Sequence, residues 1–510
     1  MQAIQWSRIS SFSRPRLAAL AAALSVCAAL AAPADPRAVI EPELATLMAR
    51  EQAAQRMPVI VRLKQQPDPA EFGRRVAGLP QAQRGGRLLE ALKAFSAGHQ
   101  AGLMQDLATR KAEGVQALST VNAVGAHLLV RDIRELAQRA DVASIRYDVG
   151  LLAPSRRLMG DPCKPERPTP RQRLPKSCLT ADRAPAVVDA TVFDARLPAS
   201  DPVAALGAPA VWQSGVTGKG VTVAIIDTGV DISHPDLVRS FRGGASDWFD
   251  PNAEQKRPID RHGHGTQIAG LVLGTGASGK TLGVAPQAQW IAARIYNNRN
   301  IARLSDLHRV MAWVLDPDGK PATADTPQIA LNAWGLGDRT GSCDTEFATD
   351  IAWLRAAGVH VVFAGGNGGP AANTSVSPAN NPGALSVGAL DASGELASFS
   401  SRGPSACDGR PYPDIAASGE MVRTTDLSAG VMLAYTMGTG SSYAAALVAG
   451  ELALLSQARP TSSVTEREAM LHPAAGDARP PLLRALGLSA AARAPGPGAA
   501  ATLAATELPR

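Results

Sequence analysis

The chain has 510 residues, of which 45% are hydrophobic and 4% aromatic, and its formal net charge is +6. This length exceeds one ordinary hydrophobic core, so two or three domains are expected. Much of the basic excess lies between Arg156 and Arg183, where arginines alternate with prolines and no aromatic residue intervenes. That pattern indicates an exposed linker, which we place at residues 151–200, and argues against a nucleic-acid-binding face.

The N-terminus has the pattern of an export signal. Three arginines precede an apolar run from Leu17 to Ala32, and Ala29-Leu30-Ala31 fits a small-residue cleavage site. No other stretch of the sequence is long and apolar enough to span a bilayer. We therefore expect residues 1–31 to be a signal peptide and the remaining protein to be secreted or periplasmic, without a stable membrane anchor.

Removal of this signal takes Cys27 with it and leaves four cysteines in an oxidising compartment. Four cysteines permit three pairings. We favour Cys163 with Cys178, within the linker, and Cys343 with Cys407.

Residues 55–150 read as a small α+β module. Alternating or β-branched segments predict three strands, with a helix-rich region after the first strand and a short helix between the other two. In chain order these are Pro58–Leu63, the helix-rich region from about Glu71 to Leu118, Val124–Val130, the helix Ile133–Arg139, and Val142–Tyr147. From the pattern alone this could also be an ordinary binding domain that stays attached.

A buried parallel strand is predicted just before Asp227. The run from Val221 to Ile226 is apolar and rich in β-branched residues, as in strands covered on both faces. Asp227 follows at the carboxyl end, the edge at which open α/β sheets place their ligand crevice. By itself, an Asp-Thr-Gly turn after a strand is more often structural than catalytic.

An imidazole and a hydroxyl stand at two further element boundaries. His264 lies between two glycines and precedes the apolar segment Ile268–Leu273, so it should begin a helix. Ser442 follows Gly440 and begins a run of small and apolar residues that can form a deeply buried helix. Each residue alone could be a turn or a helix cap. Their joint occurrence with Asp227 points instead to nucleophilic catalysis.

These segments resemble the subtilisin-like serine protease family, in the family's order. The resemblance spans roughly residues 203 to 460 and includes Ser233-His234-Pro235-Asp236-Leu237, Gly283-Val284-Ala285-Pro286, Ala364-Gly365-Gly366-Asn367 and Phe399-Ser400-Ser401-Arg402-Gly403. It implies a catalytic domain at residues 201–460 with a doubly wound, mostly parallel α/β sheet. The implied activity is that of a serine endopeptidase acting on proteins or peptides, as a monomer.

The resemblance also implies roles for individual residues. Asp227, His264 and Ser442 would form the catalytic triad, and the side-chain amide of Asn367 would contribute to the oxyanion hole. The pocket for the side chain before the scissile bond would have two walls, one of Ala333, Trp334 and Gly335 and the other of Ala364, Gly365 and Gly366. Gln267 departs from the family, which commonly has a histidine there.

The module at residues 55–150 is similar to the inhibitor-like propeptides that precede such catalytic domains. This implies a self-processing zymogen whose own propeptide is a binding partner. No cofactor is expected. Calcium remains possible, since Asp236 resembles a family calcium ligand, but the loop Gly274–Thr281 lacks the oxygen-rich side chains that hard cations need.

The same loop carries the main alternative. Gly274–Thr281 fits the phosphate-loop pattern, which alone would suggest a nucleotide-binding protein. A phosphate loop must follow a strand and open into a helix, whereas this one follows the helix begun by His264 and leads into a poor helix former, Leu282–Pro286. A catalytically silent, protease-like binding domain is the third hypothesis. Residues 461–510 are expected to be a poorly ordered, Ala/Pro-rich tail.

Overall fold

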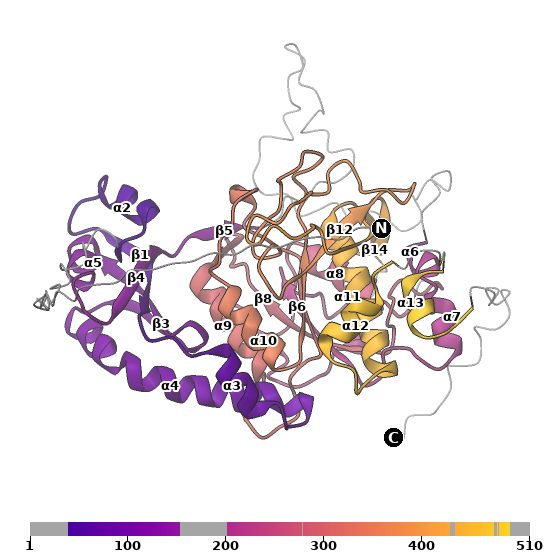
Figure 1. Cartoon of the computed structure of the whole chain (residues 1–510), viewed down its shortest axis with the longest axis horizontal. Helices are drawn as coiled ribbons and strands as arrows, with labels where there is room; N and C mark the ends of the chain where they lie inside the picture. The colour runs from indigo at the N-terminus through magenta and orange to yellow at the C-terminus, as the bar shows by residue number, and fades with distance from the viewer. Residues whose placement is uncertain are drawn as a thin grey trace, which may run out of the picture.

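The structure is a computed structural model, and it describes residues 39–153, 201–277, 279–428, 434–473, 477 and 479–489. An N-terminal module and a larger α/β unit lie side by side (Figure 1). The predicted signal peptide, most of the predicted linker and the predicted Cys163–Cys178 pair lie outside the described residues. No helix in the described ranges is both long and apolar enough to cross a bilayer.

The larger unit is built on a seven-stranded sheet in the order β13-β12-β11-β10-β6-β8-β7, with every neighbouring pair parallel. This confirms the predicted α/β fold class. Because β8 pairs with one side of β6 and β10 with the other, the strand order reverses at β6, where ligand crevices form. The strands are β6 (Thr222–Asp227), β7 (Trp248–Phe249), β8 (Gln289–Arg294), β10 (Ile329–Asn332), β11 (His360–Ala364), β12 (Leu385–Leu390) and β13 (Ile415–Ser418).

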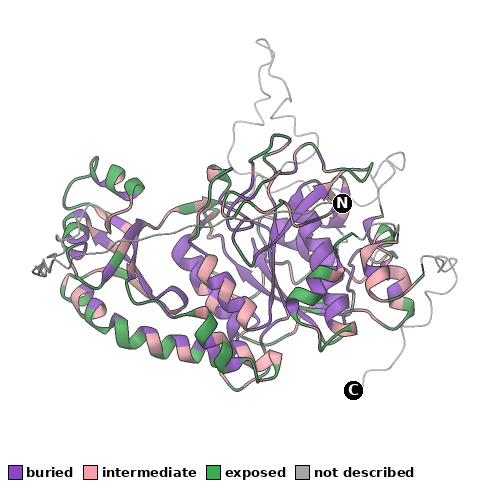
Figure 2. Ribbon diagram, in the orientation of Figure 1, coloured by how far each residue is buried: buried purple, intermediate pink, exposed green. Residues whose placement is uncertain are grey.

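Helices cover both faces of this sheet. Alternate strand residues point to opposite sides, so Val223 and Ile225 belong to one core cluster and Ala224 and Ile226 to another. The first cluster includes the apolar residues of α8 (His264–Leu273) and α11 (Ser441–Ala458), and the second those of α9 (Leu304–Leu315) and α10 (Ala348–Ala356). Helix α11 is buried almost throughout (Figure 2).

The N-terminal module has a four-stranded antiparallel sheet in the order β2-β3-β1-β4. The expectation of a helix-rich region up to Leu118 was wrong at its end, because residues 113–118 form an edge strand. That strand is mostly exposed, so its sequence lacks the alternation of a half-buried strand. The elements are α2 (Pro42–Met48), β1 (Arg56–Leu63), α3 (Pro69–Val76), α4 (Gln81–Thr109), β2 (Glu113–Leu118), β3 (Ala123–Leu129), α5 (Val130–Leu136) and β4 (Val142–Tyr147).

The module docks on α9 and α10. Strand β5 (Gly150–Leu152), at its carboxyl end, pairs antiparallel with β9 (Ile301–Arg303) of the larger unit. Asp148 accepts hydrogen bonds from the backbone N–H and hydroxyl of Ser305, at 3.0 and 2.7 Å, and so caps the first turn of α9. The module thus supplies both a strand and a helix cap to the larger unit.

The segment after residue 460 continues the fold, so the expectation of a poorly ordered tail from residue 461 was wrong for residues 464–470 and 481–485. Helices α12 (Val464–Met470) and α13 (Pro481–Ala485) form there, and Leu482 and Leu483 are buried in the core that α11 helps to build. These helices are short and follow prolines and polar residues, so the composition of the segment did not indicate them. Residues 490–510 lie outside the described part.

The larger unit begins with α6 (Pro202–Ala205) and α7 (Ala208–Gln213) and also holds the hairpin of β14 (Val422–Thr425) with β15 (Tyr435–Gly438). Single 3-10 turns occur at Ser119–Val121, Val238–Ser240 and Gly337–Arg339. The predicted disulfide between Cys343 and Cys407 is present.

Candidate active site

The structure brings the predicted acid and base into direct contact. Asp227 ends β6 and His264 begins α8, and Nδ1 of the imidazole lies 2.8 and 2.9 Å from the two carboxylate oxygens. Both residues are buried. A Cβ on Gly265 would lie 2.0 Å from the carbonyl oxygen of Gly229, so only glycine lets α8 approach the turn after β6 this closely.

A second carboxylate, which the sequence analysis missed, organises the loop before His264. Asp260 accepts hydrogen bonds from the backbone N–H groups of His262, Gly263 and Thr266 and from the hydroxyls of Thr228 and Thr266. An aspartate a few residues before a predicted helix start is the only sequence signal for this role. These bonds tie the start of α8 to the end of β6, which fixes the position of His264.

The charge around His264 favours its protonated form. Burial alone would lower the pKa of the imidazole, but the charge and hydrogen bond of Asp227, with a further contribution from Asp260, raise it above the ordinary value. Since Nδ1 faces both oxygens of Asp227, the proton of the neutral ring belongs on Nδ1. Nε2 is then the basic nitrogen.

Ser442 lies at the N-terminus of α11, at the same end of the sheet. The next residue, Tyr443, donates a 2.7 Å hydrogen bond to Oε1 of Gln267 on α8, and its ring centroid lies 6.2 Å from that of His264. The hydroxyl of Ser442 donates to the carbonyl of Ala333 at 3.2 Å. This hydroxyl must therefore redirect its hydrogen before it can donate to His264.

Asn367 lies beside the residue that precedes the nucleophile candidate. Its Oδ1 accepts a 2.9 Å hydrogen bond from the backbone N–H of Ser441, and the hydroxyl of Ser441 accepts one from the N–H of Gly366 at 3.0 Å. With Oδ1 engaged, the Nδ2 group of Asn367 is left as a donor. The N–H of Ser442 also lies in the first turn of α11, where helical N–H groups have no intrahelical acceptor.

The two predicted pocket walls follow neighbouring strands. Residues 333–335 continue from β10 and residues 364–366 from β11, and these strands pair in parallel. A Cβ placed on Gly335 or on Gly366 would lie 2.9 or 2.7 Å from a methyl group of Val376. Val376 therefore sits against both walls. No sequence signal distinguished it from other core valines.

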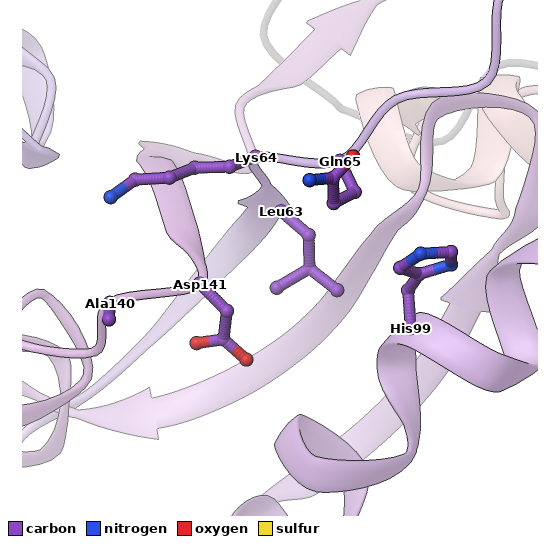
Figure 3. Close-up of a pocket in the computed structure, with 6 residues that line it drawn as sticks. All are labelled: Leu63, Lys64, Gln65, His99, Ala140 and Asp141. Carbon is purple, nitrogen blue, oxygen red and sulfur yellow. The ribbon is translucent and has the colours of Figure 1, made fainter.

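Two hollows in the described part of the chain lie away from these residues. One, of about 300 Å³, is in the N-terminal module, where Leu63 stands between His99 of α4 and Asp141 (Figure 3). The other, of about 600 Å³, lies where the module meets the larger unit, around Arg62, Arg146 and Glu346. Neither contains a predicted site residue, so the candidate site rests here on the geometry of its side chains.

A comparison with protein families matches residues 218–498 to the subtilase family, which is more than half of the chain. The chain belongs to the subtilase family. It is 34% identical to bacillopeptidase F of Bacillus subtilis (strain 168) over 289 residues, which cover 52% of this chain and 19% of that protein. It is also 34% identical to subtilisin E of the same organism, over 51% of this chain and 61% of that protein. The solved structure of sphericase is 27% identical, with a TM-score of 0.43, over 50% of this chain and 83% of that one. The chain thus covers less than two thirds of the length of bacillopeptidase F and of subtilisin E.

Within this subtilase, Asp236 is satisfied by protein donors. Its carboxylate accepts from the backbone N–H of Ala277 at 2.5 Å and from the hydroxyl of Tyr435 at 2.7 Å. Donor hydrogens occupy the positions that a cation would need, so this residue does not fit a calcium ligand here.

The phosphate-loop alternative does not fit the subtilase fold. Residues 274–281 follow α8 rather than a strand, and the described residues after them lead to β8 without an intervening helix. Ser278 of this loop lies outside the described residues. The helix N-terminus that would hold phosphates is therefore missing from the described part of this connection.

Proposed function

We propose that this subtilase is a serine endopeptidase in which Ser442 is the nucleophile, His264 the general base and Asp227 the residue that orients His264. The observation that carries the proposal is the buried contact between Asp227 and His264, with Ser442 at the start of the helix packed against α8. Bacillopeptidase F, named as a peptidase, and subtilisin E each match about half of this chain at 34% identity.

In the proposed reaction, Oγ of Ser442 attacks the carbonyl carbon of the scissile peptide while Nε2 of His264 takes its proton. Asp227 keeps the other ring proton on Nδ1 and stabilises the imidazolium. His264 then gives its proton to the departing amine, which leaves an acyl-enzyme. Attack by water, with the same base, releases the acid and restores Ser442.

The developing oxyanion would be held by two donors, the N–H of Ser442 and the Nδ2 group of Asn367. Both are fixed before the substrate arrives, because α11 is buried and Oδ1 of Asn367 is bonded to Ser441. Donors that need no reorganisation are the most effective at stabilising charge in a transition state.

We propose that substrates bind as extended strands. The chain's own β5 already pairs with the edge strand β9, which shows that this edge accepts an added strand. The described residues of the two pocket walls carry no charged side chain, and Val376 lies between them. We therefore infer a preference for apolar side chains at this pocket.

We further propose that the N-terminal module is an inhibitory propeptide and that the protein is an exported zymogen. The support is the docking of β5 on β9 and the Asp148 cap on α9, which place the module's end on the edge expected to bind substrate. Cleavage between about residues 150 and 186 would then yield the mature enzyme.

The test compares the purified chain with its Ser442→Ala and Asn367→Ala variants. We expect a fluorophosphonate probe to label the parent but not Ser442→Ala, and mass spectrometry to find the module cut from the parent alone. Asn367→Ala should still be labelled but turn over a peptide about 10²–10³-fold more slowly, the cost typical of losing one oxyanion donor. A folded parent inert to the probe would favour a silent binding domain.

A further inference from the structure

A loop far from Ser442 gathers three carboxylates. It joins α9 to β10 and contains Asp316, Asp318 and Asp325. One carboxylate oxygen from each lies within 4.8 Å of the others. Like charges this close repel one another unless a proton or a cation intervenes.

Two of these carboxylates hold buried oxygens that lack any partner. Asp316 is only 4% exposed, and its Oδ1 accepts no hydrogen bond within the described residues. Oδ1 of Asp325 is buried and unpartnered in the same way. Burial without a partner is costly for a charged oxygen, and native folds rarely keep such atoms without a use for them.

The loop backbone fixes the remaining oxygens. Oδ2 of Asp325 accepts from the N–H of Asp318 at 2.8 Å, and Oδ1 of Asp318 accepts from the N–H of Lys320 at 2.8 Å and the hydroxyl of Thr323 at 3.0 Å. These bonds orient the carboxylates in the way that outer-shell hydrogen bonds orient metal ligands. The unpartnered oxygens are the ones left for a ligand.

Among the described residues, no side-chain cation forms an ion pair with these three carboxylates. Within the described ranges, no lysine or arginine nitrogen lies within 4.0 Å of these carboxylates. Other aspartates of the larger unit do have such a partner, for example Asp247 with Arg242 and Asp306 with Arg309. Arg242 donates to the backbone oxygen of Asp325 at 2.8 Å, but its side chain pairs with Asp247. Lys93 of α4 acts on Asp316 only through space.

We propose that Asp316, Asp318 and Asp325 bind a calcium ion, with water completing the shell. Three hard oxygen donors on an irregular loop suit the flexible coordination of calcium better than the strict octahedron of magnesium. The site is separate from Asp236, whose carboxylate is filled by protein donors. Helix α4 covers the loop, because a Cβ on Gly86 would lie 2.9 Å from Pro321.

The experiment uses the full chain carrying Ser442→Ala, which stays intact whatever its activity, after treatment with a chelator. Terbium replaces calcium, and its luminescence is excited through tryptophan. Trp313 is suitably close, since its carbonyl accepts from the N–H of Asp316 at 3.1 Å. The comparison adds Asp316→Asn/Asp325→Asn and, as a matched control, Asp391→Asn in an exposed turn bonded to Ser393.

We expect saturable terbium luminescence that calcium displaces and millimolar magnesium does not. The double variant should raise the half-saturating concentration by roughly tenfold or more, while Asp391→Asn leaves it unchanged. Calcium should raise the melting temperature of the parent and not of the double variant. If the double variant does not fold, Asp316→Asn alone gives the comparison. Absence of saturable binding, or equal binding by parent and variant, overturns the proposal.

Discussion

At the scale of single residues, His264 is held by one carboxylate and positioned by another. Asp227 bonds its Nδ1 directly, whereas Asp260 bonds the backbone on both sides of it. The first contact governs the proton on the ring, and the second governs where the ring lies. The two acids therefore affect activity in different ways.

The first of these acids should set the pH dependence of activity. Only neutral His264 can act as a base, so kcat/KM should fall as the pH drops through its pKa. Because Asp227 raises that pKa, the midpoint of the acid limb should lie above the ordinary value of about 6.5. Asp227→Asn should move the limb to lower pH and cut turnover by about 10⁴. A pH–rate profile unchanged by Asp227→Asn would contradict this.

The candidate residues that could be predicted from the sequence are those at element boundaries. Asp227, His264 and Ser442 each follow or begin an apolar run, so their spacing carried a signal. Val376 has none, because it meets Gly335 and Gly366 only after β10 and β11 have paired. Contacts made by folding leave no local pattern to detect.

At the scale of elements, helix α11 carries a buried acid that the proposed mechanism does not use. Glu451 is 4% exposed, and its Oε1 has no hydrogen-bond partner within the described residues. Burial raises its pKa to about 8. The folded state therefore keeps a proton that the unfolded state loses near pH 4.5.

This difference should make the protein less stable as the pH rises. The raised pKa favours folding below pH 4.5, and the advantage is lost progressively up to about pH 8, at about 1.4 kcal/mol per pH unit. Glu451→Gln removes this titration. From pH 5 to pH 8 its free energy of unfolding, measured by urea denaturation, should gain roughly 3 kcal/mol relative to the parent. Parallel stability curves for the two proteins would contradict the expectation.

Predictability differed between elements for physical reasons. Strand β6 and helix α11 are buried, so their apolar runs are long and unmistakable. Strand β2 is an exposed edge and α13 has five residues, so neither shows a full hydrophobic period. Both are ordered by the elements they pack against.

At the scale of the whole molecule, a buried charge network joins the module to the larger unit. Arg146 of β4 pairs with Asp344 and Glu346, and Glu346 also accepts from His308, whose other ring nitrogen bonds Asp350. Asp344, Glu346 and Asp350 belong to the larger unit, whereas Glu41 of the module, 3.7 Å from Arg146, is a further acid beside the arginine. Losing the arginine would leave these acids buried beside fewer cations.

Arg146→Ala should therefore weaken module docking by about 2–5 kcal/mol, which is 30-fold or more. In the cleaved but still associated protein, the rate at which peptidase activity appears should rise accordingly. Arg75→Ala is the matched control, because Arg75 pairs with Glu71 on its own helix and lies over Phe72. Equal release by both variants would show that the network does not hold the module.

The parallel sheet and a separate module could be predicted from the sequence, but the way in which the two fit together could not. Thr120 of the module bonds Asp350, and Gln81 bonds the carbonyl of Gly358, across more than 200 positions of sequence. Such pairs depend on the docked surfaces and not on local spacing.

Helix α7, near the start of the larger unit, touches α13, the last helix of the described residues. A Cβ on Gly207, just before α7, would lie 2.6 Å from the side chain of Leu483 in α13. Cutting the backbone anywhere in residues 154–200 would thus break the covalent link to the module and leave the contact between α7 and α13 intact. Removing the residues after 480 would instead delete α13 and expose Val211 and its apolar neighbours to solvent.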